Sequence, residues 1–299
     1  MAPPRGAPRS RSVGTLTGGL VLAVTAVATG SIFARHSQLD PLSKAGWRCG
    51  IAALLLIGPA LRAGGWSALP VGRSLLAGLL LALHFGAWLW SLDHTSVAVS
   101  VLLVNTTPLW VALLSNRVNG EEVAARARFG LGLGLAGALG LPLVEALLAP
   151  GGPTMLGALG PALALIGALG WAGYTLAGRG VVREAPLVTY LCVCYGVAAL
   201  ALALAAAVSG RAEVPADLAE WTPILGLALV PQLVGHSLLN WALQSLTAVM
   251  VSIAALGEPL LASILAWVIL GEVPGLPVLL AAPVVAAGVL TVARAENRT

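Results

Sequence analysis

Apolar residues run along this chain in stretches of about 20, separated by charged residues or by proline and glycine. A stretch of this length matches an α-helix that crosses a lipid bilayer. The short connecting segments predict neighbouring helices that run antiparallel and pack as one bundle. The pattern predicts ten transmembrane helices over residues 13–34, 45–61, 71–91, 96–116, 127–147, 156–178, 187–209, 222–243, 247–270 and 276–293.

The composition agrees with this interpretation. Of the 299 residues, 58% are hydrophobic and only 9% are charged, whereas ordinary soluble domains carry about a quarter charged residues. A soluble protein with so few charges could not cover its surface. The fold class is therefore predicted to be all-α and integral to the membrane.

The positive charges test the number of helices independently. With ten spans and a cytoplasmic N-terminus, three basic residues fall outside, namely Arg35, Lys44 and Arg211, and Arg48 lies within a helix. The twelve cytoplasmic ones are Arg5, Arg9, Arg11, Arg62, Arg73, Arg117, Arg126, Arg128, Arg179, Arg183, Arg294 and Arg298. This positive-inside bias predicts both termini in the cytoplasm and a multi-pass protein of the inner (plasma) membrane. It also accounts for the net charge of +4 without a nucleic-acid partner.

The N-terminus allows a second interpretation. Arg5, Arg9 and Arg11 precede an apolar run that ends near Ala26-Val27-Ala28, which also fits a cleaved signal peptide. Cleavage would leave nine spans and would spoil an internal symmetry of the chain.

That symmetry is a repeat of the chain at a shift of 151 residues. The distance from proline to glutamate is thirteen residues in both halves. Because each half holds five spans, the second half enters the membrane from the opposite side, which is the inverted repeat of many secondary transporters. The aligned pairs are Trp90-Ser91-Leu92 with Trp241-Ala242-Leu243, Pro108 with Pro259, and Gly120-Glu121 with Gly271-Glu272.

The repeat divides the chain into segments. We predict a cytoplasmic tail over 1–12, a first five-helix repeat over 13–147 and an external linker over 148–155. A second five-helix repeat over 156–293 and a cytoplasmic tail over 294–299 complete the chain.

Both halves resemble the EamA module of the drug/metabolite transporter superfamily. The resemblance spans about residues 13–293 and rests on Trp90 to Glu121 with Thr95-Ser96-Val97-Ala98, on Gln232-Leu233-Val234-Gly235-His236, and on Asn240-Trp241-Ala242-Leu243 through Thr247, Glu258-Pro259 and Gly271-Glu272. It implies a ten-helix fold with a central cavity and, by family habit, export of amino acids, metabolites or drugs. The halves differ at one position, because Thr107 stands where the second half has Glu258.

Glu258 is the first candidate for a transport role. It is the acidic residue near the middle of its predicted span, where an ionisable group is costly and usually faces a cavity or a partner. The following Pro259 lacks an N–H and is expected to free a backbone carbonyl at this depth. Glu258 could bind a substrate amine or a proton. Alternatively, it could be protonated and form a structural hydrogen bond to a neighbouring helix. Pro108 and Pro259 are the candidate hinges.

Further polar and aromatic residues are candidates for the substrate site. Arg48 could attract a carboxylate, although a long side chain near a helix end also snorkels to the interface. Gln232, His236 and Asn240 recur every four residues and so share one face of a helix, which faces a cavity or a neighbouring helix. Weaker candidates, with a packing role as the alternative, are His84 and Trp88, Trp171 and Tyr174, and Asn105.

Other features predict structure rather than function. Gly130, Gly134, Gly137 and Gly140 recur every three or four residues and predict close helix packing. The glycines of Gly120-Glu121 and Gly271-Glu272 are expected to end helices. Cys49, Cys192 and Cys194 form neither a disulfide framework nor a zinc pattern, so we expect no metal and no cofactor.

Three classes of function remain for comparison. A secondary transporter fits the inverted repeat and the mid-span prolines. A membrane-embedded enzyme, such as a lipid-modifying transferase, needs clustered acids, histidines or nucleophiles, which are scattered here. A non-transporting scaffold is excluded less firmly, whereas an ATP-driven pump lacks a phosphate-binding loop. The sequence thus predicts a non-enzymatic carrier that works by alternating access, with or without proton coupling, and leaves the oligomeric state, monomer or homodimer, open.

Overall fold

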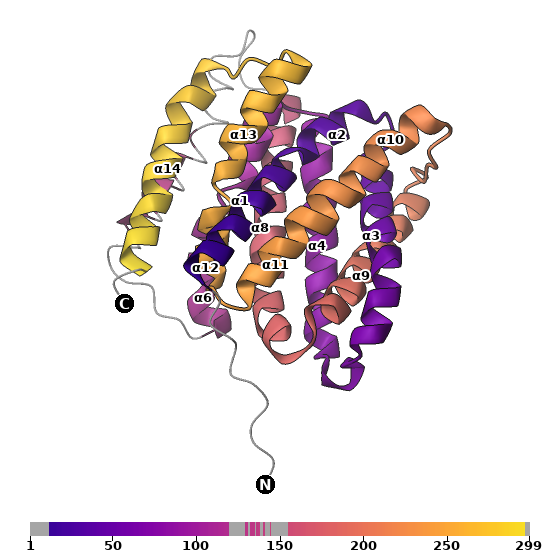
Figure 1. Cartoon of the computed structure of the whole chain (residues 1–299). Coiled ribbons are helices and arrows are strands. Elements are labelled where there is room, and N and C mark those ends of the chain that lie inside the picture. Colours follow the sequence, from indigo (N-terminus) through magenta and orange to yellow (C-terminus); the bar gives the residue numbers. More distant parts are fainter. Residues whose placement is uncertain are drawn as a thin grey trace.

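The computed structural model describes residues 12–119, 129, 130, 132–134, 136, 137, 140, 144 and 155–296. Every regular element within these residues is a helix. Eight helical segments are long and apolar enough to cross a membrane, and the helices stand side by side as one bundle (Figure 1). A shorter apolar stretch, Leu276–Gly288, lies in the last helix. The protein is therefore an all-helical, multi-pass membrane protein.

The first half contributes four of the eight spans. Two of them are broken into a pair of shorter helices. In chain order the elements are α1 (Val13–Ala28) with α2 (Gly30–His36), α3 (Pro41–Ala63), the short η1 (Trp66–Ala68), α4 (Val71–Leu92), and α5 (Val97–Val104) with α6 (Thr107–Asn119).

The second half contributes the other four spans and the last helix. Its elements are α8 (Met155–Glu184), α9 (Leu187–Val208), α10 (Leu218–Leu227) with η2 (Ala228–His236) and α11 (Ser237–Leu243), α12 (Ala248–Ala254) with α13 (Gly257–Leu265) and η3 (Ala266–Leu270), and α14 (Leu276–Glu296). Both η2 and η3 are π-helical, with a wider turn than an α-helix.

The observed spans begin and end within a few residues of those predicted. Several predicted segments lie outside the described residues: most of the tail 1–12, Gly120-Glu121, most of the span 127–147, the linker up to residue 154, and 297–299. The total of ten spans and the orientation of the termini therefore stay predictions.

The repeat extends to the capping of the broken helices. Ser96 caps α5 by accepting a hydrogen bond from the N–H of Val99, and Thr247 caps α12 in the same way from Met250. Residues 96 and 247 are 151 apart, as the sequence repeat requires. Two residues separate each of these short helices from the next helix, so both halves place a helix break at mid-span.

The two prolines lie in the first turn of the helix that follows each break, where proline is well tolerated. The carbonyl that Pro259 was expected to free is hydrogen-bonded, so that prediction was wrong, and the matching carbonyl before Pro108 is hydrogen-bonded too. The Thr107 hydroxyl donates to the carbonyl of Val104 at 2.8 Å, and the N–H of Glu258 donates to that of Ala255 at 2.9 Å. Because the chain turns tightly at each break, these two donors lie close to the carbonyls that proline, which has no N–H, cannot bond.

Glycines let the central helices approach closely. The most extensive contacts join α4 with α8 and α3 with α9. Gly134 and Gly137, from the predicted glycine-lined helix, lie against Leu109 and against Val284 of α14, which confirms their packing role, whereas no neighbour lies within 4 Å of a Cβ built at Gly140. Gly271 ends η3 with a positive φ of 72°, as expected of a helix terminator.

Replacing Gly170 with alanine is expected to destabilise the protein by about 1–3 kcal/mol, the usual cost of overpacking. A Cβ at this position would lie 2.8 Å from the backbone N of His84 and 3.0 Å from the carbonyl oxygen of Leu80, so α4 and α8 must separate. Thermal unfolding in detergent measures the change. Gly58→Ala is the control, because nothing lies within 4 Å of its Cβ, and an equal loss in both variants would contradict the argument.

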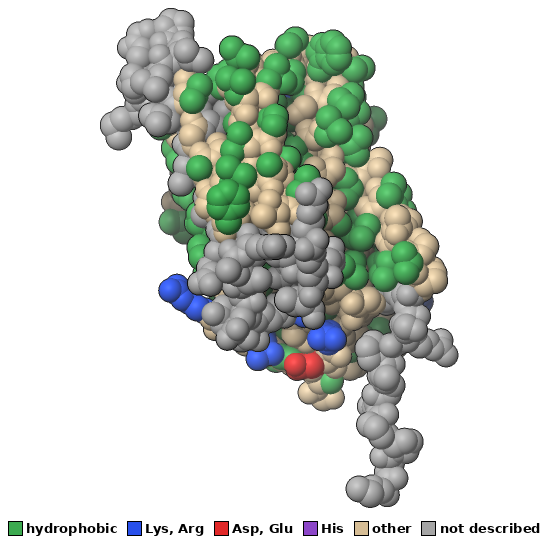
Figure 2. Space-filling view, turned by 90° about the vertical axis from the view of Figure 1, so that its left-hand side faces the viewer, with side chains coloured by type: hydrophobic (Ala, Val, Ile, Leu, Met, Phe, Trp, Pro, Cys, Tyr) green, Lys and Arg blue, Asp and Glu red, His purple; other side chains and the backbone are tan. Residues whose placement is uncertain are grey.

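The ion pairs of the described residues lie at the two ends of the bundle. Figure 2 shows a largely apolar face with the basic and acidic side chains gathered at its lower end. Arg73 pairs with Glu184 at 3.7 Å, and both lie on the predicted cytoplasmic side. At the other end Arg35 pairs with Glu272 at 3.1 Å. Each of these pairs joins residues that the ten-span topology assigns to the same side.

Candidate functional site

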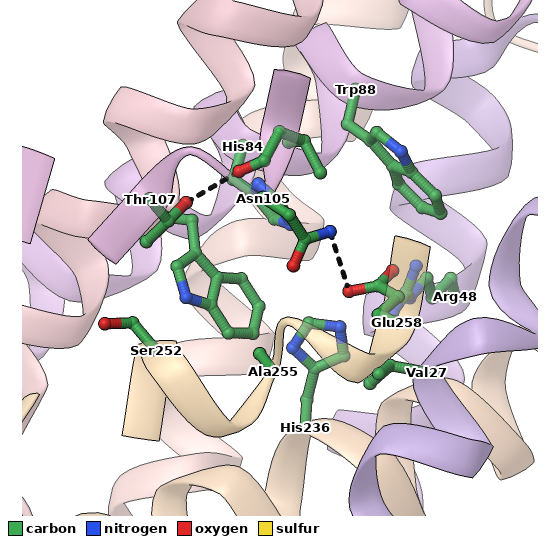
Figure 3. A pocket seen from close by; sticks show the side chains of 12 residues that line it. Val27, Arg48, His84, Trp88, Asn105, Thr107, His236, Ser252, Ala255 and Glu258 are labelled. Atoms are coloured by element: carbon green, nitrogen blue, oxygen red, sulfur yellow. Dashed lines mark hydrogen bonds between the residues drawn. The ribbon is translucent and has the colours of Figure 1, made fainter. Parts of the chain in front are cut away.

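A small cavity lies at the centre of the bundle, at the level of the two helix breaks (Figure 3). Its volume is about 30 Å³, enough for one or a few water molecules. A solute as large as an amino acid fits only after the walls move apart. The lining residues come from both halves of the chain: Val27, Arg48, His84, Trp88, Val104, Asn105, Thr107, Trp171, His236, Ser252, Ala255 and Glu258.

Glu258 enters the cavity from the first turn of α13. One carboxylate oxygen, Oε2, accepts a hydrogen bond from Nδ2 of Asn105 at 3.3 Å. Asn105 also donates to the carbonyl of Val101, which fixes the orientation of its amide. The bond therefore joins the break in the first half to the break in the second (Figure 3).

Arg48 reaches the cavity from α3 and is almost completely buried, with 1% of its surface exposed. This excludes snorkelling to the interface. Its Nε donates to Oε1 of Gln232 at 2.7 Å, and the guanidinium lies 3.8 Å from the ring centroid of Phe85. Aromatic stacking and one hydrogen bond thus hold the group in place. Within the described part of the chain, Arg48 and Glu258 do not form an ion pair with each other.

Several buried nitrogen atoms around this position have no hydrogen-bond partner among the described residues. They are Nη1 and Nη2 of Arg48, Nε1 of Trp88, Nε2 of Gln232 and Nδ1 of His236. Buried polar groups in folded proteins are nearly always satisfied, so a cluster of this kind requires a reason. Nδ1 of His236 can donate or accept a hydrogen bond, and the other four nitrogens are donors. The group that would satisfy these donors is an acceptor such as a carboxylate.

Aromatic rings form the rest of the wall. His84 lies parallel to Trp88, with ring centroids 6.3 Å apart, and 4.9 Å from the ring of Trp171. His236 lies 4.6 Å from Trp171. Nδ1 of His84 lies 2.9 Å from the carbonyl oxygen of Gly167, so this nitrogen carries the proton and Nε2 is the acceptor of the neutral ring.

Seven of the ten predicted site residues line this cavity: Glu258, Arg48, His84, Trp88, Asn105, Trp171 and His236. Gln232 lies behind Arg48 as its hydrogen-bond partner. Asn240 and Tyr174 bond to each other away from the cavity, and Asn240 also donates to the carbonyl of His236 at 2.7 Å. Of the two alternatives that the sequence left open for this helix, His236 therefore faces the cavity, whereas Asn240 bonds to a neighbouring helix.

The π-helical turn of η2 explains this difference. Spacing by four residues places side chains on one face only when every turn is α-helical. The wider turns of η2 end at His236, and Asn240 lies in the regular helix α11 beyond them. Gln232 and His236 are thus related by a π-helical turn, whereas His236 and Asn240 are related by an α-helical one, so a spacing of four does not place all three on one face.

Sequence reasoning did not select Phe85, Thr107 or Ser252 for the site. Thr107 carried a usable signal, because the repeat aligns it with Glu258. Phe85, which supports Arg48, and Ser252 sit in apolar segments without a distinguishing pattern. Within the part of the chain that the structure describes, no group of three or more His, Cys, Asp or Glu side chains could hold a metal ion.

A family model described as the EamA-like transporter family matches residues 17–142 and matches again over residues 158–294. The chain belongs to the EamA-like transporter family. The two matches correspond to the two halves of this EamA protein. A crystal structure described only as that of a protein superposes with a TM-score of 0.67, over 96% of this chain and 99% of the other, at 21% identity. That likeness shows the fold alone, and a comparison with curated proteins finds no match.

Proposed function

We propose that this EamA protein is a secondary transporter of the plasma membrane that exports an amino acid or a small amphipathic metabolite or drug. One observation carries the proposal: Arg48 and Glu258 face one mid-membrane cavity, without an ion pair between them and with unsatisfied donors around Arg48. An α-amino acid has complementary charges, because its carboxylate can bind the guanidinium and its ammonium can bind the glutamate. Charges this deep in a bilayer are costly without such a use.

The mechanism is alternating access. The cavity is too small for an amino acid, so binding requires the two repeats to separate at one end. The breaks before Pro108 and Pro259 are places where each span can bend without losing regular helix hydrogen bonds. Glu258 exchanges a proton for the substrate ammonium, which would couple export to the proton gradient. Movement of the repeats about these breaks then exposes the site to the other side.

Flux through proteoliposomes of the purified protein tests the proposal. Labelled amino acids and small amphipathic metabolites are screened with and without a pH gradient. Saturable flux that follows the gradient is the expected result. Saturable flux indifferent to the gradient would refute the coupling, whereas no flux across a broad panel, from protein shown to be folded, would refute transport and favour a scaffold.

The ion pair of Arg35 with Glu272 belongs to a set of contacts at one end of the bundle, which we call the ionic latch. Besides its pair with Glu272, Arg35 donates to the carbonyl of Thr95 at 2.9 Å, and Oε2 of Glu272 accepts from the N–H of Val97 at 2.8 Å. The latch joins α2, the α4–α5 turn and the segment after η3, so it spans both repeats. Opening the cavity to the predicted external side separates these segments.

Replacing Glu272 with glutamine is expected to speed external access to the cavity by up to about fivefold, since exposed ion pairs contribute at most about 1 kcal/mol. The measurement is labelling of Ser252→Cys by an impermeant maleimide added outside cells, in a protein whose three native cysteines are replaced. Arg73→Gln, which breaks the pair at the opposite end, is the matched control. Equal labelling in both variants would show that the latch does not control access.

A further inference from the structure

A second cavity of about 340 Å³ lies beside the central one, between α5, α13, η3 and α14. Its volume falls in the range of small-molecule sites. Its lining is almost wholly apolar: Ala98, Leu102, Asn105, Leu256, Pro259, Leu260, Ser263, Ile264, Trp267, Pro274, Val278, Leu279, Ala282, Val285 and Ala286. We refer to it as the lateral groove.

The lateral groove adjoins the central cavity at one pair of residues. Asn105 lines both spaces. Glu258 lines the central cavity, and the next residue, Pro259, lines the groove. The hydrogen bond of 3.3 Å between Asn105 and Glu258 is therefore part of the partition between the polar space and the apolar one.

The groove opens on the outer surface of the bundle. Three of its lining side chains are more than half exposed, Leu260 at 67% and Trp267 and Leu279 at 59% each. In a membrane-spanning bundle this surface meets lipid rather than water. The groove thus offers an apolar space that extends from the hydrocarbon of the bilayer to the partition beside Glu258.

We infer that the lateral groove binds the apolar side chain of the substrate whose charged head lies between Arg48 and Glu258. The inference rests on the proposed function and specifies its substrates as amino acids with long apolar side chains. The substrate ammonium replaces the Asn105 amide as the donor to Glu258, and the released amide moves out of the partition. The side chain then passes between Asn105 and Pro259 into the groove, while the carboxylate remains on Arg48.

A homologous series of amino acids tests this assignment. Norvaline, norleucine and 2-aminooctanoate share one head group and differ only in chain length. In proteoliposomes we expect their inhibition constants against labelled norleucine counterflow to fall by roughly fourfold for each added methylene, the factor for complete burial of one CH₂ group. Constants that do not fall with chain length would overturn the inference.

Filling the groove gives the decisive comparison. Ala282→Phe places a ring in the groove at a position that does not line the central cavity, and Ala201→Phe on α9, which lines neither space, is the matched control. The gain in affinity with increasing side-chain length is expected to disappear in Ala282→Phe and to persist in Ala201→Phe. An equal dependence of affinity on side-chain length in both variants would overturn the inference.

The two proposals fail in distinguishable ways. Saturable flux of other amino acids with no preference for long chains contradicts the groove assignment alone. Absence of saturable flux for every solute contradicts the transport function on which it rests.

Discussion

Glu258→Gln is expected to lower the flux of an amino acid substrate by roughly ten- to hundredfold, because a hydrogen bond to a charged group contributes about 1.5–3 kcal/mol. Glutamine keeps the shape of the side chain and can still bond to Asn105, but it can neither hold an ammonium by charge nor exchange a proton. The response of flux to a pH gradient should therefore vanish as well. Proteoliposome flux at matched protein density, with and without the gradient, measures both effects.

Two controls make the result specific to Glu258. Glu184→Gln removes a carboxylate that is exposed at the end of α8 and pairs with Arg73, and it should leave flux unchanged. Glu258→Asp keeps the charge on a shorter side chain and should recover part of the gradient response. Normal flux and normal gradient dependence in folded Glu258→Gln would exclude this residue from transport.

Arg48→Met is expected to weaken amino acid binding by roughly ten- to hundredfold while leaving the melting temperature of the substrate-free protein unchanged or higher. Two of the three guanidinium nitrogens of Arg48 have no partner among the described residues, so its burial contributes little to stability. Removing it removes the anchor of the substrate carboxylate, whose loss costs roughly ten- to hundredfold in affinity. Thermal unfolding with and without substrate records both effects in one experiment.

The nature of the ligand separates this role from a structural one. An alkylamine lacks the carboxylate, so its affinity should be nearly equal in the wild-type protein and in Arg48→Met, whereas the amino acid of the same chain length should lose its affinity. Arg48→Lys keeps the charge but loses the planar fork that binds a carboxylate through two nitrogens, and it should give an intermediate result. Equal losses for the amine and the amino acid would show that Arg48 shapes the cavity without binding the substrate.

The sequence was sufficient to predict the features that depend on local pattern. Apolar run lengths gave the spans, and the repeat of Pro108 at Pro259 placed a break in each half. Glu258 and Arg48 stood out because a charge within a span is costly wherever the helix lies. Their neighbours across the cavity depend instead on how helices pack, and no local pattern brings Asn105 to Glu258 across 153 positions of the chain.

The remaining differences have two physical causes. Asn240 donates a hydrogen bond to Tyr174 within the bundle, as polar side chains between packed helices often do, and their spacing alone could not distinguish this from a cavity. The lateral groove is formed by apolar residues from four elements, each of which has the composition of any lipid-facing surface. Shape rather than residue type defines it, so it could be found only in three dimensions.

The π-helical segment η2 has a consequence for the direction of transport. At the shift of 151 residues it aligns with residues 77–85, which lie in the regular α-helix α4. Two identical inverted repeats would relate the inward-open and outward-open states by a two-fold axis in the membrane plane and give them equal free energy. In the proposed alternating-access mechanism, the wider turn beside Arg48 in one repeat alone removes this equivalence, so we expect the empty protein to favour one orientation before any ion gradient acts.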